Sequence, residues 1–130
     1  MEEQSDGSAR TPSGAGAMTC VTSEQWSDRV GVVAVTGVVD MLTAPVLEDA
    51  IRTALDKDPV GLVIDLSEVD FLASAGMGIL VAVHDEVSPE VRLAVVAEGP
   101  ATSRPLKLLG IADIIPLYST VDEAVAALRA

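Results

Sequence analysis

The chain has 130 residues, a length at which one domain is usual. Hydrophobic residues make up 49% of the chain and aromatic residues only 2%, so aliphatic side chains must form the core. The formal net charge of −12 argues against binding to nucleic acid or to an anionic membrane surface, because both depend on clustered lysine and arginine.

Residues 1–17 are rich in serine, glycine and alanine, and we expect a disordered tail ahead of one folded domain at 18–130. Within that domain, apolar runs of strand length are bounded by turn residues. The predicted strands cover residues 19–26, 30–39, 60–65, 91–97 and 114–117. Only three residues separate the first two strands, which favours an antiparallel hairpin.

Between and after these strands, apolar residues recur at the spacing of an amphipathic helix. The predicted helices cover residues 43–57, 74–86 and 103–109, and a last helix follows Thr120. Thr43 is the expected N-cap of the first helix. The order β-β-α-β-α-β-α-β-α predicts an α/β fold: a mixed sheet of four to five strands, parallel after the hairpin and covered by about four helices.

One serine stands out at the expected start of the second helix, in the segment 71–78, directly after the predicted central strand. Its small neighbours Ala73, Ala75 and Gly76 leave the hydroxyl of Ser74 open to close approach by another protein. A phosphate on that hydroxyl would lie near unpaired backbone N–H groups and the positive end of the helix dipole. The sequence therefore predicts Ser74 as the functional residue and as a phosphate acceptor.

Catalysis and cofactor binding find little support in the residues. The lone histidine, His84, would stand about 15 Å from Ser74 along one helix at 1.5 Å per residue, beyond hydrogen-bond reach. The segment 76–81 lacks the third glycine of a dinucleotide-binding loop. We therefore expect a protein that is not an enzyme and that carries no cofactor.

Metal ligands are also scarce. A single cysteine, Cys20, excludes an internal disulfide, and with one histidine it cannot complete a transition-metal site. The carboxylates of Asp65, Glu68 and Asp70 leave a loose Ca²⁺ or Mg²⁺ site open, although a solvated loop explains them better.

The segment pattern also bears on location. The first seventeen residues carry three acidic side chains and no apolar core of a signal peptide. The longest uncharged apolar stretch, 71–83, has 13 residues, whereas a membrane span needs about 20. We expect a cytoplasmic protein.

Several segments together resemble the STAS domain family. They are residues 37–40, 63–67 and 71–78, with further similarity at 109–111 and 118–124. The closer resemblance is to the stand-alone bacterial members of the family, the anti-sigma factor antagonists, and it extends over about residues 18–130.

This resemblance implies a partner switch. In such proteins the unphosphorylated form binds an anti-sigma factor that is also a serine kinase, and a sigma factor is thereby released. The kinase phosphorylates the serine that aligns with Ser74, which breaks the complex, and a serine phosphatase reverses the step. The resemblance implies a partner surface made of Asp40, Thr43, Ala73, Ser74, Ala75, Gly76 and Met77.

The chain departs from the family at one position of the motif. Family members commonly have aspartate immediately before the acceptor serine, and this chain has Ala73. The carboxylate that would orient the hydroxyl or meet the kinase is missing, so two other functions stay open. One is an interaction scaffold that is not phosphorylated. The other is a sensor of a small ligand or nucleotide in the groove between Asp40 and Ser74.

Overall fold

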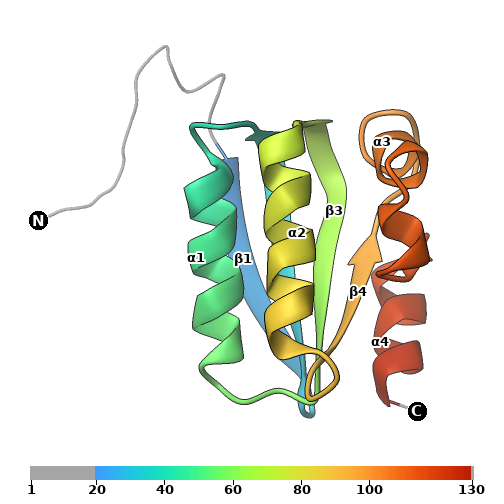
Figure 1. The fold of residues 1–130 in the computed structure, drawn as a ribbon. Coiled ribbons are helices and arrows are strands. Elements are labelled where there is room, and N and C mark those ends of the chain that lie inside the picture. Colours follow the sequence, from blue (N-terminus) through green and yellow to red (C-terminus); the bar gives the residue numbers. More distant parts are fainter. Residues whose placement is uncertain (1–19, 130) are drawn as a thin grey trace, which may run out of the picture.

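Aliphatic and β-branched runs form the five strands of one mixed sheet in the computed structural model, which describes residues 20–129. They lie side by side in chain order, β1 antiparallel to β2 and every later pair parallel (Figure 1). The strands are β1 (Cys20–Ser27), β2 (Val30–Val39), β3 (Gly61–Leu72), β4 (Arg92–Val96) and β5 (Leu117–Tyr118). The predicted mixed sheet with its N-terminal hairpin is confirmed, whereas the predicted tail at 1–17 lies outside the described residues.

Helices cover both faces of this sheet. Over residues 20–129 they are α1 (Ala44–Leu55), α2 (Ser74–Val87), α3 (Ser103–Leu108) and α4 (Val121–Arg129), with a 3₁₀ turn at Ile111–Asp113. Every one of these described helices is too short or too polar to cross a lipid bilayer.

The core has two layers, one on each side of the sheet. Leu47 and Ile51 of α1 and Leu80 of α2 are fully buried with aliphatic side chains of β2, β3 and β4. On the other face, Ala124 and Leu128 of α4 pack against valines of the same strands. Both faces of the central strands are thus buried, as expected of parallel strands joined by helices.

Arg52 joins the two helices of the first layer. Its guanidinium lies 2.7 Å from the Glu86 carboxylate of α2 and 3.0 Å from that of Glu48, one turn earlier in α1. All three groups are well exposed to solvent, so this network sets how α1 and α2 align more than it stabilises the fold.

Because β2, β3 and β4 are parallel, their carboxyl ends meet at one end of the molecule. The turn before α1, the start of α2 and the loop before α3 all lie there (Figure 1). We call it the carboxyl end of the sheet. Open α/β sheets commonly bind their ligands at this end, so we expect the functional site there.

The third strand is longer than predicted. The sequence indicated a strand over 60–65 followed by a loop, but β3 continues to Leu72. Two register shifts against β2 admit the extra residues, since Ala34 pairs with Asp65 but Thr36 pairs with Glu68. β4 pairs only with the first part of β3, so later polar side chains face solvent. The polar residues at 67, 68 and 70 therefore mark an exposed strand rather than a loop.

The last strand was also misplaced. Residues 114–117 were predicted as a strand, but β5 consists of Leu117 and Tyr118 only. Gly110 has a φ of 79° and starts the 3₁₀ turn, which carries the chain through Ile114. Ile115 is fully buried, so the apolar run there serves the core without pairing in the sheet.

Candidate functional site

The turn after β2 is held by hydrogen bonds centred on Asp40. Its carboxylate oxygen Oδ1 accepts the backbone N–H of Leu42 at 2.9 Å and that of Thr43 at 3.0 Å. The Thr43 hydroxyl accepts the backbone N–H of Asp40 at 2.9 Å and donates to the Val38 carbonyl at 2.7 Å. Thr43 thus holds the predicted N-cap position of α1, but its side chain fixes the preceding turn instead of the helix.

These bonds make the turn sensitive to acid. The backbone N–H of Thr43 above all, and then that of Leu42, holds the pKa of Asp40 below its ordinary value. A folded-state pKa below the unfolded one means that the carboxylate stabilises the fold above the unfolded pKa, and that this contribution is lost as pH falls through the folded pKa. Unfolding by denaturant, measured from about pH 6 to about pH 2, should show a shallower loss of stability for Asp40→Asn than for wild type. Parallel profiles would contradict this.

Ser74 is the first residue of α2. Ala73, in extended conformation with φ −85° and ψ 167°, is the N-cap. The side chain of Ser74 is exposed, and its hydroxyl makes no hydrogen bond with any residue that the structure describes. The serine therefore does not cap its own helix. It presents a free hydroxyl at the positive end of a 14-residue helix.

The start of α2 is pressed against the end of β2. The backbone N–H of Ala73 donates to the Val39 carbonyl at 2.8 Å. A Cβ on Gly76 would lie 2.5 Å from Cγ1 of Val39 and 2.9 Å from Cδ1 of Leu72, so only glycine allows this approach. Since Val39 directly precedes Asp40, these contacts hold the Ser74 hydroxyl in a fixed place relative to the Asp40 turn.

The missing aspartate before Ser74 has a cost in stability. Ala73 is an N-cap without a capping side chain. Ala73→Asp should raise the free energy of unfolding by about 1 kcal/mol, because a carboxylate can accept an orphan N–H of the first turn and meets the positive helix end. Thermal unfolding measures it. The control is Ala82→Asp at an exposed mid-helix position of α2, which should not stabilise. Equal effects at the two positions would rule the capping argument out.

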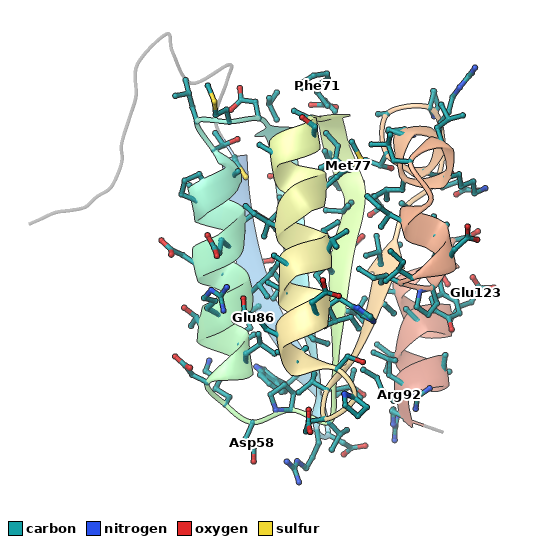
Figure 2. All side chains as sticks on the ribbon, viewed as in Figure 1. Asp58, Phe71, Met77, Glu86, Arg92 and Glu123 are labelled. Atoms are coloured by element: carbon teal, nitrogen blue, oxygen red, sulfur yellow. The ribbon has the colours of Figure 1, made fainter. Side chains whose placement is uncertain are left out.

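Large apolar side chains surround this end of the molecule and face solvent. Met41 and Leu42 in the Asp40 turn are 77% and 83% exposed, and Phe71 at the end of β3 is 54% exposed. Figure 2 shows Phe71 at the end of the molecule where α2 begins. We call Met41, Leu42, Phe71 and Ser74 the apical patch. Exposed apolar side chains at one end of a molecule are typical of a surface that contacts another molecule.

The structure separates the seven predicted contact residues into two groups. Ser74 is exposed, and four residues are partly buried but still reach the surface: Asp40, Thr43, Ala73 and Ala75. Gly76 is buried and Met77 is 5% exposed within the core. These last two residues are turned inward, so they shape the start of α2 and cannot offer a side chain to a partner.

Sequence reasoning missed Met41 and Leu42 altogether and treated Phe71 only as part of a motif. A signal was present, because two large apolar residues occupy a four-residue turn that opens with Asp40 and closes with Thr43. Turn residues are usually small or polar, and an apolar pair in such a turn has no place in the core.

Other chemistry at this end is limited in residues 20–129. No group of three histidine, cysteine or acidic side chains is placed to hold a metal ion there. Burial, and then the charge of Asp40, raises the pKa of the Cys20 thiol, so this cysteine stays protonated and is a poor nucleophile. The Ser74 hydroxyl, by contrast, is exposed and makes no hydrogen bond with a described residue.

Comparison with known proteins places this geometry in a family. The family model described as the STAS domain matches residues 23–124. The anti-sigma-F factor antagonist RsfB of Mycobacterium tuberculosis is 40% identical over 100 residues, which cover 77% of this chain and 82% of RsfB. The chain belongs to the STAS domain family.

Solved structures agree with this assignment. The crystal structure of an anti-sigma factor antagonist from Mycobacterium paratuberculosis superposes with a TM-score of 0.82 at 46% identity, covering 86% of this chain and 96% of that one. The Bacillus cell fate determinant SpoIIAA in its phosphorylated form superposes with a TM-score of 0.64 at 16% identity, covering 84% and 100%. The second match, at this low identity, shows the fold alone.

Proposed function

We propose that this protein is an anti-sigma factor antagonist of the bacterial cytoplasm. In the proposal its unphosphorylated form binds an anti-sigma factor of the serine-kinase type and so frees a sigma factor. Phosphorylation of Ser74 by that kinase ends the binding, and a serine phosphatase restores it. The protein acts by binding and is not an enzyme.

The observation that carries the proposal is the free Ser74 hydroxyl among exposed apolar side chains. The apolar groups of the apical patch favour a protein partner, because their burial in a complex removes apolar surface from water. Phosphorylation of the Ser74 hydroxyl, which lies at the same end of the sheet, would allow this contact to be turned off. The names of the relatives support this choice, since RsfB and the M. paratuberculosis protein are both called anti-sigma factor antagonists.

The local structure around Ser74 also suits phosphorylation by a kinase. Phosphoryl transfer depends on positioning by the enzyme, so the substrate need only present a hydroxyl that can be reached in line with ATP. Ala73 and Ala75 are small, and the helix start holds Ser74 in place through the Val39 contact described above. A phosphate at this position would lie at the positive end of α2, so the phosphorylated fold would remain intact.

Incubation with the purified host anti-sigma factor and ATP tests the proposal. Intact-mass spectrometry should show one added phosphoryl group on the wild-type protein and none on Ser74→Ala. Ser67→Ala is the matched control, because Ser67 is another exposed serine near this end on β3, and it should be modified like wild type. A protein that forms no complex with the anti-sigma factor would refute the proposed function.

A scaffold without phosphorylation is the second candidate, and Ala73 is the observation that favours it. The same experiment separates the two functions, because a scaffold forms the complex but gains no phosphoryl group. Ala73→Asp is informative here too. If the missing carboxylate limits the kinase, this variant should be phosphorylated faster than wild type, while a scaffold that is no substrate would show no such change.

A further inference from the structure

Most of the basic residues in the described part of this acidic chain have a partner. The chain has eight of them, and Arg10 lies outside the described residues, which leaves seven. The four that form ion pairs with carboxylates are Arg29, Arg52, Lys57 and Arg129. Arg92 donates to the Ala127 carbonyl.

The last two, Arg104 and Lys107, stand apart. Both are exposed, and neither forms an ion pair or a side-chain hydrogen bond with any residue in the described part of the chain. The carboxylates nearest to them in sequence, Glu98 and Asp113, are exposed as well and are not bonded to them. The chain has 20 acidic residues, yet these two neighbouring cations have no partner among the described residues. This favours pairing with a carboxylate of another molecule.

These two cations share one face of α3. Arg104, Lys107 and Leu108 follow the i, i+3, i+4 spacing of neighbours on a helix surface. They line an open groove of about 480 Å³ together with Ser103 and the loop residues Gly99 and Pro100. The groove thus carries the positive charges of Arg104 and Lys107 beside the apolar side chain of Leu108.

Large aliphatic side chains lie beside the charges. Leu108 is 75% exposed and Leu109 is 61% exposed. Leu106, between the charged positions, is fully buried and fixes α3 to the core. The helix is therefore anchored by one face and presents an opposite face that is both basic and apolar. We call Arg104, Lys107 and Leu108 the α3 patch.

The position of this patch relates it to the apical patch. α3 follows β4 and α2 follows β3, and these neighbouring strands are parallel, so both helices start at the carboxyl end of the sheet (Figure 1). Helices packed side by side are about 8–10 Å apart, and a standard interface buries about 800 Å² of each partner. One partner of ordinary size can therefore cover both patches.

We propose that the α3 patch is a second contact surface for the partner that binds at Ser74, and that it takes a segment of that partner in which carboxylates flank aliphatic side chains. The inference rests on the proposed function. Charge pairs at the rim of an interface act mainly on register and on the rate of association. Because the net charge of the chain is −12, much of its surface should repel an acidic segment. This pair of cations offers such a segment a place to dock.

Binding of the purified host anti-sigma factor to charge-reversed protein tests the inference. At about 0.1 M salt, Arg104→Glu/Lys107→Glu should bind about tenfold more weakly than wild type, and the difference should shrink at about 1 M salt, where charges are screened within about 3 Å. The matched control is Arg29→Glu/Arg129→Glu, which changes net charge equally. Arg29 pairs with Asp58, which lies at the end of the molecule opposite to Phe71 (Figure 2), and Arg129 pairs with Asp28 in the turn between β1 and β2. The control should bind nearly as wild type does.

Two further arms test the chemistry of the occupant. Leu108→Ser should weaken binding by several-fold, since it removes an exposed aliphatic contact without touching the core. Carbodiimide, which joins an amine to a carboxylate in contact with it, should link Lys107 to an aspartate or glutamate of the anti-sigma factor, as read by peptide mass spectrometry. A link from Lys107 to an acidic residue of this chain, or no link, would overturn the inference.

These experiments distinguish failure of the α3 inference from failure of the proposed function. If Ser74→Glu weakens the complex but the two charge-reversed variants bind alike, only the α3 inference is wrong. If wild type forms no complex, or if Ser74→Glu binds as tightly as wild type, the proposed function is wrong and the α3 inference falls with it.

Discussion

Ser74→Glu should weaken binding of the anti-sigma factor by about two to four orders of magnitude, while Ser74→Ala should bind as tightly as wild type. The estimate treats the new charge as the surviving half of a broken buried ion pair, which costs about 3–5 kcal/mol. Each 1.4 kcal/mol is about tenfold in the dissociation constant.

The reason lies in the surroundings of the hydroxyl. Met41, Leu42 and Phe71 are exposed apolar groups at the same end of the sheet, and a partner that covers them removes water from Ser74. A charge there loses its hydration, and no cation of the described residues 20–129 is bonded to the Ser74 side chain to compensate for it. Phosphoserine carries about −1.5 to −2 charges, so phosphorylation should act at least as strongly as the single charge of glutamate.

Titration calorimetry of each variant against the purified anti-sigma factor measures the effect. Ser67→Glu is the control, because it adds the same charge at another exposed serine of the described chain, and it should bind within a few-fold of wild type. Matching losses for Ser67→Glu and Ser74→Glu would mean that net charge, not the position of Ser74, governs the complex.

Gly76→Ala should destabilise the fold by about 1–3 kcal/mol, whereas Gly78→Ala should stabilise it by about 0.5–1 kcal/mol. The two substitutions are chemically identical and lie two residues apart in α2. The new methyl group of Gly76→Ala would meet Val39 at 2.5 Å and force the helix start away from β2. That of Gly78→Ala meets no atom within 4 Å, so only the gain in helix propensity remains.

Denaturant unfolding of the two variants beside wild type checks this prediction. Because Gly76 holds the start of α2 against Val39, Gly76→Ala should also weaken binding of the anti-sigma factor by displacing Ser74. A folded Gly76→Ala protein with unchanged stability would show that the approach of α2 to β2 is less close than the structure gives.

Much of the fold could be predicted from sequence, because its signals are local. The short hairpin link, the aliphatic strand runs and the helical spacing of Leu47 and Ile51 each depend on residues close together in the chain. The extension of β3 could not be read in this way. Whether Glu68 lies in a loop or on an exposed strand depends on how far β2 continues alongside it, since Glu68 pairs with Thr36, and that is a property of the neighbouring strand.

The candidate site likewise has features that the local sequence predicts and features that depend on tertiary packing. Ser74 was predicted from its small neighbours and its place at a helix start, and the structure gives it a free, exposed hydroxyl. Gly76 and Met77 belong to the same motif, but their inward direction follows from packing against Val39 and the core. The exposure of Leu42 and the unpaired state of Arg104 are also tertiary facts, since each depends on which distant side chains fail to reach it.

The ion pair between Arg129 and Asp28 has a practical consequence. It ties the last turn of α4 to the hairpin at the amino ends of the parallel strands, at 2.7 Å. The two proposed contact surfaces, the apical patch and the α3 patch, are at the opposite end of the molecule. A biosensor chip or a fluorescent reporter attached at the turn between β1 and β2 would leave both patches clear, and complexes formed by immobilised protein would report on the free molecule.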